Sequence, residues 1–353
     1  MSVTGIQEKL AAAGARLGSY RGAQTPASFG NTAAEFRALL ESCAIFDMGW
    51  QAKLVLSGED RVRWLNGMVT NNIRDLVPGR GVYSFLLNAQ GHIQGDIVAY
   101  NRGDHLLITT DCEQSPRITA IFDRYIIMDD VEVADITDKL ATIGVAGPKA
   151  REVLSTAGVE AFQLEPGQVI DTVARDAGIS VARGAQPAID GYEIWFSPQN
   201  ADRVWDAVQS GGAQQVGSDA VELHRIVKGV PRFGVDLRER DLPQETGQVY
   251  ALNFAKGCYI GQEIVERIRA RGNVHRTLTG FEVDGDPPPP GTKVRANEKD
   301  VGEITNAVRV PFPSGERTLA LGYLRREVAA PGTTVQVGNQ SATVATLPFR
   351  DER

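Results

Sequence analysis

Short apolar runs, bounded by glycine, proline, asparagine or aspartate, recur along the whole chain. Runs of this length, with turn residues at their ends, are typical of β-strands. As far as residue 196 they predict strands at 45–48, 53–58, 82–87, 92–100, 105–110, 131–133, 141–146, 179–182 and 192–196.

Apolar residues spaced three and four positions apart alternate with these runs and predict helices. One such stripe leads from Phe36 to Cys43, in a helix for which Asn31 or Thr32 is the expected cap, and it predicts a core position for Cys43. Further helices are predicted at 7–17, 60–68, 115–125, 148–157, 200–210, 218–229 and 262–271. Strands and helices that alternate without a regular crossover spacing favour an α+β fold over a doubly wound parallel sheet.

The stretch from Asp284 to Gly291 contains four consecutive prolines. It can be neither helix nor central strand, because proline has no backbone N–H and a fixed φ. Short strands separated by turn residues surround it and predict an antiparallel β-barrel over 276–353. These strands are expected at 277–283, 293–296, 302–308, 319–324, 334–337 and 341–346.

Length and composition narrow the class of protein. A chain of 353 residues exceeds what one hydrophobic core usually organises, so two or three domains are expected. The 42% hydrophobic and 23% charged residues exclude a disordered or fibrous protein. No apolar run is long enough to span a bilayer, and residues 1–10 show no export signal, so we expect a cytoplasmic protein without membrane contact. With a net charge of −7, the chain has no overall excess of positive charge that would favour binding to nucleic acid.

The cysteines and histidines are scattered without the spacing of metal ligands. We therefore expect reduced thiols, no disulfide framework and no dedicated metal site. The cysteines are Cys43, Cys112 and Cys258, and the histidines are His92, His105, His224 and His275.

One octapeptide combines residue types that are unusual in a purely structural segment. It reads Lys256-Gly257-Cys258-Tyr259-Ile260-Gly261-Gln262-Glu263. Its two glycines predict a tight loop that presents Cys258 and Tyr259, with Glu263 in the first turn of the following helix, where negative charge is favoured. Lys256 and the helix N-terminus favour the thiolate form, as in a nucleophile, a redox thiol or a transient metal ligand. A buried structural cysteine is the alternative.

This octapeptide resembles the signature of the YgfZ family, folate-binding proteins related to the T-protein (aminomethyltransferase) of the glycine cleavage system. The resemblance covers roughly residues 30–350 through motifs in the same order. The further motifs are Gly58-Glu59-Asp60-Arg61, Leu65-Asn66-Gly67, Thr70-Asn71-Asn72, Asn88 to Asp96, Gly191-Tyr192-Glu193-Ile194, Arg225 and Gly229 to Asp236.

The resemblance implies a T-protein-like folate-binding fold of two mixed α/β units and a C-terminal antiparallel β-barrel. We place one α+β folate-binding unit at 1–50 and 140–275. A second unit at 51–139 completes the folate cleft, and the barrel occupies 276–353. The implied cofactor is tetrahydrofolate or another reduced folate.

The resemblance implies a folate site formed by Tyr83, Asp96, Tyr192, Glu193 and Arg225, in which Glu193, flanked by Tyr192 and Trp195, binds the pterin. The pterin carries an amino group and ring N–H donors, and a carboxylate is their natural acceptor. An outward-facing strand residue is the alternative interpretation of Glu193.

A catalytic acid is implied at Asp96, which we expect to face Tyr83 across a hairpin. T-proteins typically have paired aspartates here, whereas this chain has Gly95-Asp96, so Asp96 either catalyses or only binds.

Arg225 matches the arginine that faces the folate in this superfamily and is expected to clamp a carboxylate or stack on a ring. T-proteins carry a glutamate two residues later, where this chain has Val227, so an ion pair that orients the arginine is not expected there. A helix-surface arginine is the alternative. The run Arg267, Arg269, Arg271, His275 and Arg276 favours either an anion such as a polyglutamyl tail or simply an exposed basic helix.

Two functions follow from the resemblance. The first is a tetrahydrofolate-binding protein of YgfZ type that assists assembly or repair of iron–sulfur clusters in client enzymes, with Cys258 acting together with a partner's thiols. The second is a folate-dependent aminomethyltransferase that moves a one-carbon unit to tetrahydrofolate, with Asp96 as its best support. The octapeptide favours the first, and whether the chain is an enzyme stays open.

Overall fold

The computed structural model describes residues 5–160, 164–272 and 274–351, with the side chain of Arg271 excepted. The chain divides into two compact units. Unit 1 comprises Met1–Gly67, Asn71–Ser84 and Ile97–Glu222, and unit 2 comprises Met68–Thr70, Phe85–Asp96 and Leu223–Arg353. We expected no export signal in residues 1–10, and residues 1–4 of this stretch lie outside the described residues.

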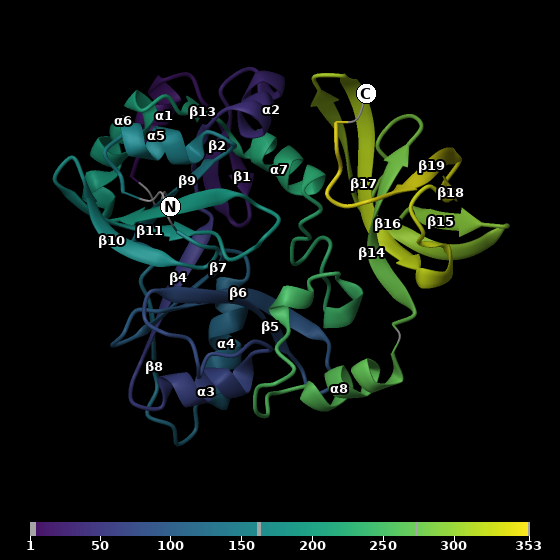
Figure 1. Ribbon diagram of the computed structural model, residues 1–353, viewed down its shortest axis with the longest axis horizontal. Helices are drawn as coiled ribbons and strands as arrows, with labels where there is room; N and C mark the ends of the chain where they lie inside the picture. The colour runs from purple at the N-terminus through teal and green to yellow at the C-terminus, as the bar shows by residue number, and fades with distance from the viewer. Residues whose placement is uncertain (1–4, 161–163, 273, 352–353) are drawn as a thin grey trace. The chain divides into compact units, whose positions relative to one another are not determined.

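A six-stranded sheet forms the centre of unit 1 (Figure 1). Its strand order is β10-β11-β12-β9-β3-β13, and neighbouring strands are antiparallel except β13 and β3, which are parallel. The bounds are β3 (Ala44–Asp47), β9 (Ala141–Ala146), β10 (Val169–Ala174), β11 (Ala177–Arg183), β12 (Gly191–Phe196) and β13 (Gln214–Gln215).

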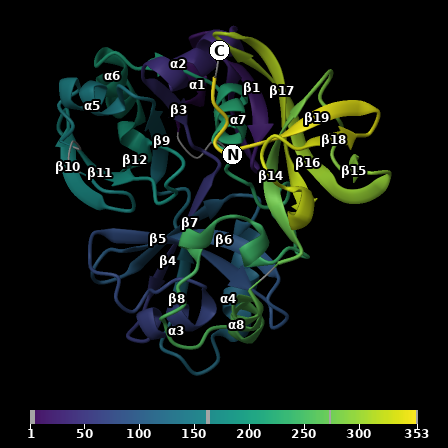
Figure 2. The ribbon, with the colours of Figure 1, turned by 45° about the vertical axis from the view of Figure 1, so that its right-hand side comes forward.

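Two helices, α5 (Ala150–Thr156) and α6 (Ala201–Ser210), cover one face of this sheet (Figure 2). Trp205 of α6 and Ile194 of β12 have no accessible surface and belong to one hydrophobic cluster. The same unit contains α1 (Gln7–Ala12), the hairpin of β1 (Arg16–Tyr20) with β2 (Ala23–Ser28), and α2 (Thr32–Glu41). The side chain of Asn31 caps α2 by accepting from the Ala34 N–H, which confirms one of the two predicted caps.

A five-stranded sheet follows the order β5-β6-β7-β4-β8. Its strands are β4 (Gln51–Ser57), β5 (Arg80–Leu87), β6 (Ile93–Asn101), β7 (Leu106–Asp111) and β8 (Glu132–Asp135). Two helices, α3 (Arg61–Met68) and α4 (Ser115–Tyr125), meet through an edge-to-face contact of Trp64 with Phe122, whose ring centroids are 5.2 Å apart.

Unit 2 contains a closed six-stranded barrel of order β14-β17-β16-β15-β18-β19 (yellow-green to yellow in Figure 1). The strands are β14 (Arg276–Val283), β15 (Lys293–Ala296), β16 (Lys299–Phe312), β17 (Gly315–Arg325), β18 (Thr334–Val337) and β19 (Gln340–Ala345). Phe281, Val294 and Leu324 are buried in its core. Helix α8 (Gln262–Arg271) precedes the barrel, and α7 (Ser218–Val227) extends from unit 1 into unit 2.

The predicted α+β class with a C-terminal antiparallel barrel is confirmed, and α8 has the predicted bounds. The predicted helix at 7–17 is wrong beyond Ala12, because Gly14 adopts a positive φ of 93° and β1 begins at Arg16. The β1–β2 hairpin and strand β10 were not predicted. The division at residues 50, 139 and 275 stays a prediction. No helix in the described part of the chain is long and apolar enough to cross a membrane.

Candidate functional site

Glu193 and Tyr192 lie on opposite faces of the unit 1 sheet, because successive side chains of a strand alternate. Tyr192 is buried in the cluster beneath α5 and α6. Trp195 belongs to a different cluster, on the face that Glu193 shares. The expectation that Tyr192 lines a site beside Glu193 is therefore wrong, and Trp195 is the aromatic neighbour of that acid.

Two donors hold one oxygen of the Glu193 carboxylate. Gln51 Nε2 and Trp195 Nε1 donate to Oε2 at 2.9 and 3.1 Å. Gln51 is itself oriented by the Thr142 hydroxyl, which donates to its Oε1 at 3.2 Å. Glu193 is partly exposed, and within the described residues no hydrogen bond reaches its Oε1. The acid is thus fixed in place with one oxygen left for a donor from outside the protein.

A buried lysine supports the charge of this acid. Lys53, on β4, has no accessible surface and donates from Nζ to the backbone oxygen of Gln51 at 2.9 Å. Burial raises the pKa of Glu193, and the bonds from Gln51 and Trp195 and the charge of Lys53 oppose this rise. Burial also lowers the pKa of Lys53 to about 8, although the Glu193 charge acts in the other direction. Lys53 therefore still favours its charged form at neutral pH.

Tyr100 completes this cluster. Its ring meets Trp195 edge to face with centroids 4.8 Å apart, and it has no accessible surface. Its hydroxyl is buried without a hydrogen-bond partner among the described residues. Burial and the charge of Glu193 raise the Tyr100 pKa, so the hydroxyl remains a potential donor. Gln51, Lys53 and Tyr100 were not predicted as site residues. The alternation of Gln51 and Lys53 with apolar residues at the start of β4 was the one sequence signal for two polar side chains on the same face of that strand.

Tyr83 and Asp96 lie on the adjacent strands β5 and β6. Tyr83 is buried in unit 1, and its backbone oxygen accepts from Asn71 Nδ2 at 3.0 Å. Asp96 is partly exposed in unit 2, where burial and the Asp96 charge raise the pKa of Tyr250. The sequence analysis missed Tyr250. That Tyr83 and Asp96 face one another stays a prediction.

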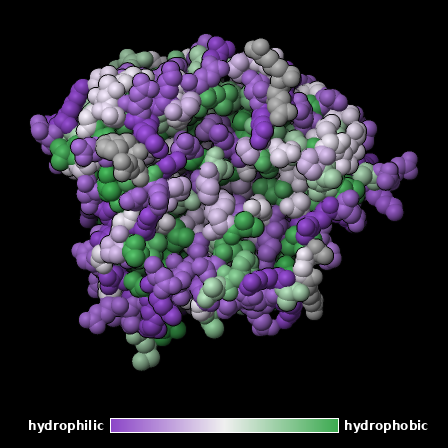
Figure 3. Space-filling view, in the orientation of Figure 1, coloured by the Kyte–Doolittle hydropathy of each residue, from purple (hydrophilic) through white to green (hydrophobic). Residues whose placement is uncertain are grey.

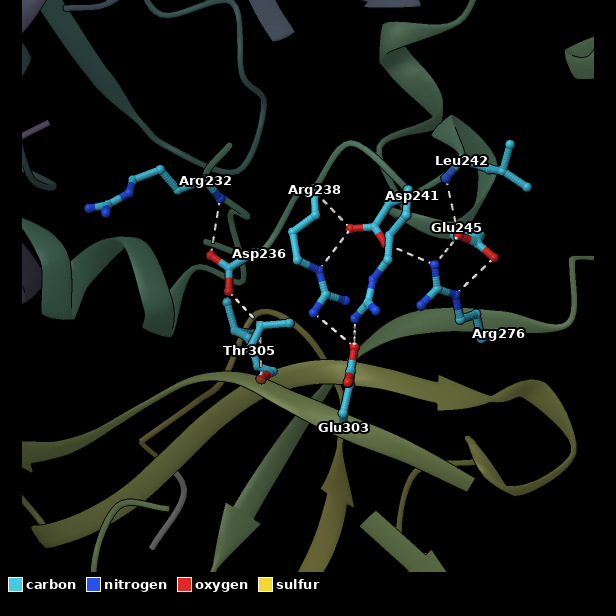
Figure 4. A network of polar contacts seen from close by, with 11 residues as sticks. Arg232, Asp236, Arg238, Asp241, Leu242, Glu245, Arg276, Glu303 and Thr305 are labelled. Carbon is cyan, nitrogen blue, oxygen red and sulfur yellow. Dashed lines mark hydrogen bonds and ion pairs between the residues drawn. The ribbon is translucent and has the colours of Figure 1, made fainter. Parts of the chain in front are cut away.

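Arg225 is buried in an ion pair within unit 2. Only 2% of its side chain is exposed, and Nη1 lies 2.8 Å from Oδ2 of Asp236, which has no accessible surface. Asp236 also accepts from the Arg232 N–H at 3.1 Å and from the Thr305 hydroxyl at 2.6 Å (Figure 4). Val227 supplies no acid to Arg225, as expected, and the arginine pairs instead with Asp236, a partner that the sequence did not predict. In this structure Arg225 is enclosed by protein and does not present its guanidinium to a ligand.

The octapeptide loop exposes Cys258 but buries Tyr259 and Lys256. Lys256 Nζ lies 2.6 Å from the backbone oxygen of Val69 and 5.0 Å from the centre of the Tyr259 ring. The expectation that Tyr259 is presented by the loop is therefore wrong, since its ring packs inward over the lysine. Gly261 has a positive φ of 82°, and a side chain there would meet the Asn88 oxygen at 2.6 Å, which accounts for this glycine.

The remaining loop residues continue into α8. Gly257 and Glu263 are exposed, and Gln262 begins the helix with Glu263 in its first turn, as predicted. No group of three histidine, cysteine, aspartate or glutamate side chains in the described ranges is placed to hold a metal ion. Cys43 is buried, as predicted for a core residue, and burial raises its pKa to about 12.

The basic run after the loop is largely compensated by acids. Arg267 pairs with Glu263 at 2.8 Å and Arg269 with Glu266 at 3.6 Å along α8. Arg276 pairs with Asp241, and the side chain of Arg271 lies outside the described part. These pairs favour the interpretation of α8 as an ordinary exposed basic helix.

Two family models match the chain. The model described as GCVT N-terminal domain matches residues 6–256. The model described as Glycine cleavage T-protein C-terminal barrel domain matches residues 276–351.

Aminomethyltransferases are among the relatives that match nearly the whole chain. The chain is 27% identical to an aminomethyltransferase of Rubrobacter xylanophilus, over 98% of this chain and 93% of the relative. It is 26% identical to an aminomethyltransferase of Halothermothrix orenii, over 95% of this chain and 96% of the relative. Among solved structures, glycine cleavage system aminomethyltransferase T from Bartonella henselae matches with a TM-score of 0.87 at 20% identity, over 99% of this chain and 98% of that one, which establishes the fold.

Replacing Lys53 with methionine is expected to remove a pH-dependent part of the folding stability. The folded protein releases the Lys53 proton near pH 8, whereas the unfolded chain releases it near its ordinary pKa of 10.5. The unfolded state therefore binds more protons between these values, and the free energy of unfolding gains about 3 kcal/mol from Lys53 as pH rises through this window. Urea unfolding across pH 7–10.5 should show the wild type gaining stability relative to Lys53→Met.

Lys139→Met, at an exposed site, is the control and should show no such trend. If the stability difference between wild type and Lys53→Met does not change with pH, the Lys53 charge is not buried.

Replacing Arg225 with alanine is expected to destabilise the protein by about 3–5 kcal/mol, because Asp236 then keeps a buried charge without its cation. Denaturant unfolding measures this change. Arg295→Ala breaks an exposed ion pair with Asp300 and should cost less than about 1 kcal/mol. Equal effects of the two substitutions would mean that the Arg225 pair is not buried in solution.

Proposed function

We propose that this chain, which belongs to the family defined by the GCVT N-terminal domain, binds tetrahydrofolate and transfers a one-carbon unit from an aminomethyl donor to it. Two relatives support this activity, because both are aminomethyltransferases matched over nearly their whole length. The C-terminal barrel model supports the same assignment.

The observation that carries the proposal is the Glu193 carboxylate, held at Oε2 by Gln51 and Trp195 and open at Oε1. A pterin offers an amino group and ring N–H donors on one edge, and a charged acceptor forms stronger hydrogen bonds with them than a neutral one. Lys53 favours the ionised form of Glu193, and the rings of Trp195 and Tyr100 form an apolar cluster beside it. We infer that Glu193 accepts the pterin N–H groups and so orients the folate.

Asp96 is the acid that we propose for the reacting centre. Aminomethyl transfer releases an amine, and a positioned carboxyl group assists by holding or supplying a proton there. The partial exposure of Asp96 leaves it accessible to a substrate. Since the second aspartate of T-proteins is replaced by Gly95, Asp96 acts alone in this role.

Glu193→Gln is expected to weaken tetrahydrofolate binding by roughly 10- to 100-fold, because a hydrogen bond to a charged acceptor contributes about 1.5–3 kcal/mol. Anaerobic calorimetry measures the affinity, and Asp171→Asn on β10 of the same sheet is the matched control. In the wild type, affinity should also fall as pH drops through the raised pKa of Glu193, since protonation removes the acceptor. Unchanged binding by Glu193→Gln would refute the pterin role of Glu193, and the absence of binding by the wild type would refute the folate assignment.

A second candidate function is the YgfZ-type role in assembly or repair of iron–sulfur clusters in client enzymes. The exposed Cys258 supports it, because the other two cysteines are buried or partly buried and only Cys258 lies in the octapeptide. One thiol cannot hold a cluster by itself, so a client or assembly protein would supply further thiols. Folate binding is common to both candidates.

The two functions separate on two substitutions. If the chain is an aminomethyltransferase, Asp96→Asn abolishes methylene transfer from a lipoyl-carried aminomethyl donor and Cys258→Ala leaves it intact. If it serves iron–sulfur clients, purified protein shows no transfer, and a strain with Cys258→Ala loses client-enzyme activity. Cys112→Ala, at the partly buried cysteine, is the control for thiol loss in general.

A further inference from the structure

A second cluster of charge lies within unit 2, where residues 238–245 contact the barrel strands β14 and β16. Figure 4 shows Arg238, Asp241, Glu245, Arg276 and Glu303 pointing toward one another. Glu303 lies 2.8 Å from Arg238 and 3.3 Å from Lys293, and it also pairs with Arg240. Arg276 donates to Asp241 at 2.8 Å and to Glu245 at 2.9 and 3.0 Å.

Positive charge exceeds negative charge in this cluster. Among the described residues, its cations are Arg238, Arg240, Arg276 and Lys293, and its carboxylates are Asp241, Glu245 and Glu303. Two further ion pairs at the margin leave this excess at one charge: Arg325 with Glu327 at 3.8 Å, and Arg295 with Asp300 at 2.8 Å. A local positive excess inside a protein of net charge −7 favours an anion at this place.

Tyr323 provides a buried donor beside these cations. Its ring lies between two guanidinium groups, with Arg276 at 4.7 Å and Arg238 at 5.4 Å from the ring centre. Tyr323 is 1% exposed, and its hydroxyl has no hydrogen-bond partner among the described residues. Burial raises the Tyr323 pKa, so the hydroxyl keeps its proton. Arg238 Nη2 is a second buried donor that lacks a partner in the described part of the chain.

A cavity of about 340 Å³ adjoins the cluster. Tyr323, four cations and two carboxylates form its polar lining; the cations are Arg240, Arg276, Lys293 and Arg325, and the carboxylates are Asp300 and Glu303. We propose that this cavity binds a small anion through carboxylate or phosphate oxygens, with the Tyr323 hydroxyl and the arginine and lysine side chains as donors. The volume is at the small end of ligand sites, which favours a compact anion over a large cofactor.

Two sources present such oxygens: a chain of glutamyl carboxylates and a phosphate group. Arginine suits both, because its planar guanidinium donates in a fork that matches carboxylate and phosphate geometry. Glu303 competes for Arg240 and Lys293, so an anion binds by drawing these cations from a carboxylate that they already share. This inference does not depend on Glu193 or on folate binding in unit 1.

Calorimetry at low ionic strength tests the site with inorganic phosphate and, separately, with a triglutamate peptide that carries no pterin. We expect binding of at least one anion that weakens as salt is added. Arg325→Gln and Tyr323→Phe should each weaken it roughly tenfold, as expected for loss of a hydrogen bond to a charged group. Glu303→Gln should tighten it, because the competing carboxylate is gone.

Arg309→Gln is the matched control, since Arg309 is an exposed barrel arginine outside the cavity lining. Tighter binding of the peptide identifies the glutamyl chain as the source, and tighter binding of phosphate identifies a phosphorylated ligand. The absence of binding by both anions overturns the proposal. Equal weakening by Arg309→Gln and Arg325→Gln also overturns it. Arg325 is exposed, so Arg325→Gln keeps the test valid if Tyr323→Phe does not fold.

Discussion

Charged side chains withdrawn from water need partners, and this requirement organises both units. Removing a charge from water costs several kcal/mol unless hydrogen bonds and an opposite charge compensate. In unit 2 the compensation converges on Asp236, which binds the Arg225 guanidinium, the Arg232 N–H and the Thr305 hydroxyl. One carboxylate thereby joins α7, the segment that follows it and strand β16. This buried acid is therefore one of the contacts between that helix and the barrel.

In unit 1 the same requirement shapes the Glu193 site. Lys53 is enclosed with one hydrogen bond, to the Gln51 backbone, and the Gln51 side chain in turn holds Glu193. A structural core has little reason to keep a lysine there, because an apolar residue of similar size avoids the cost of burying charge. The positive charge of Lys53 is explained if it keeps Glu193 ionised despite the burial of that acid. Lys53, Gln51 and Glu193 are therefore best understood as one electrostatic unit whose accessible end is Glu193 Oε1.

The two candidate functions depend on different parts of the molecule. Folate binding rests on a partly buried acid of β12 that Gln51 of β4 and Trp195 of β12 hold in place with hydrogen bonds. The iron–sulfur role rests on an exposed thiol in a loop, whose neighbours Lys256 and Tyr259 turn inward. A preorganised acid suits tight recognition of a small ligand, whereas an exposed thiol on a short loop suits contact with another protein.

Local signals in the sequence determined where individual helices and short strands begin and end. Gly261 and Gly272 bound α8, Asn31 caps α2, and the turn residues between short apolar runs predict the barrel. The T-protein resemblance added Glu193 and Asp96 as candidate site residues. Only the tertiary structure decided that Asp236 pairs with Arg225, that Tyr192 turns away from Glu193 and that Lys53 is buried behind it. The reason is physical: caps and turns depend on neighbours in sequence, whereas burial and ion pairing depend on which distant segments pack together.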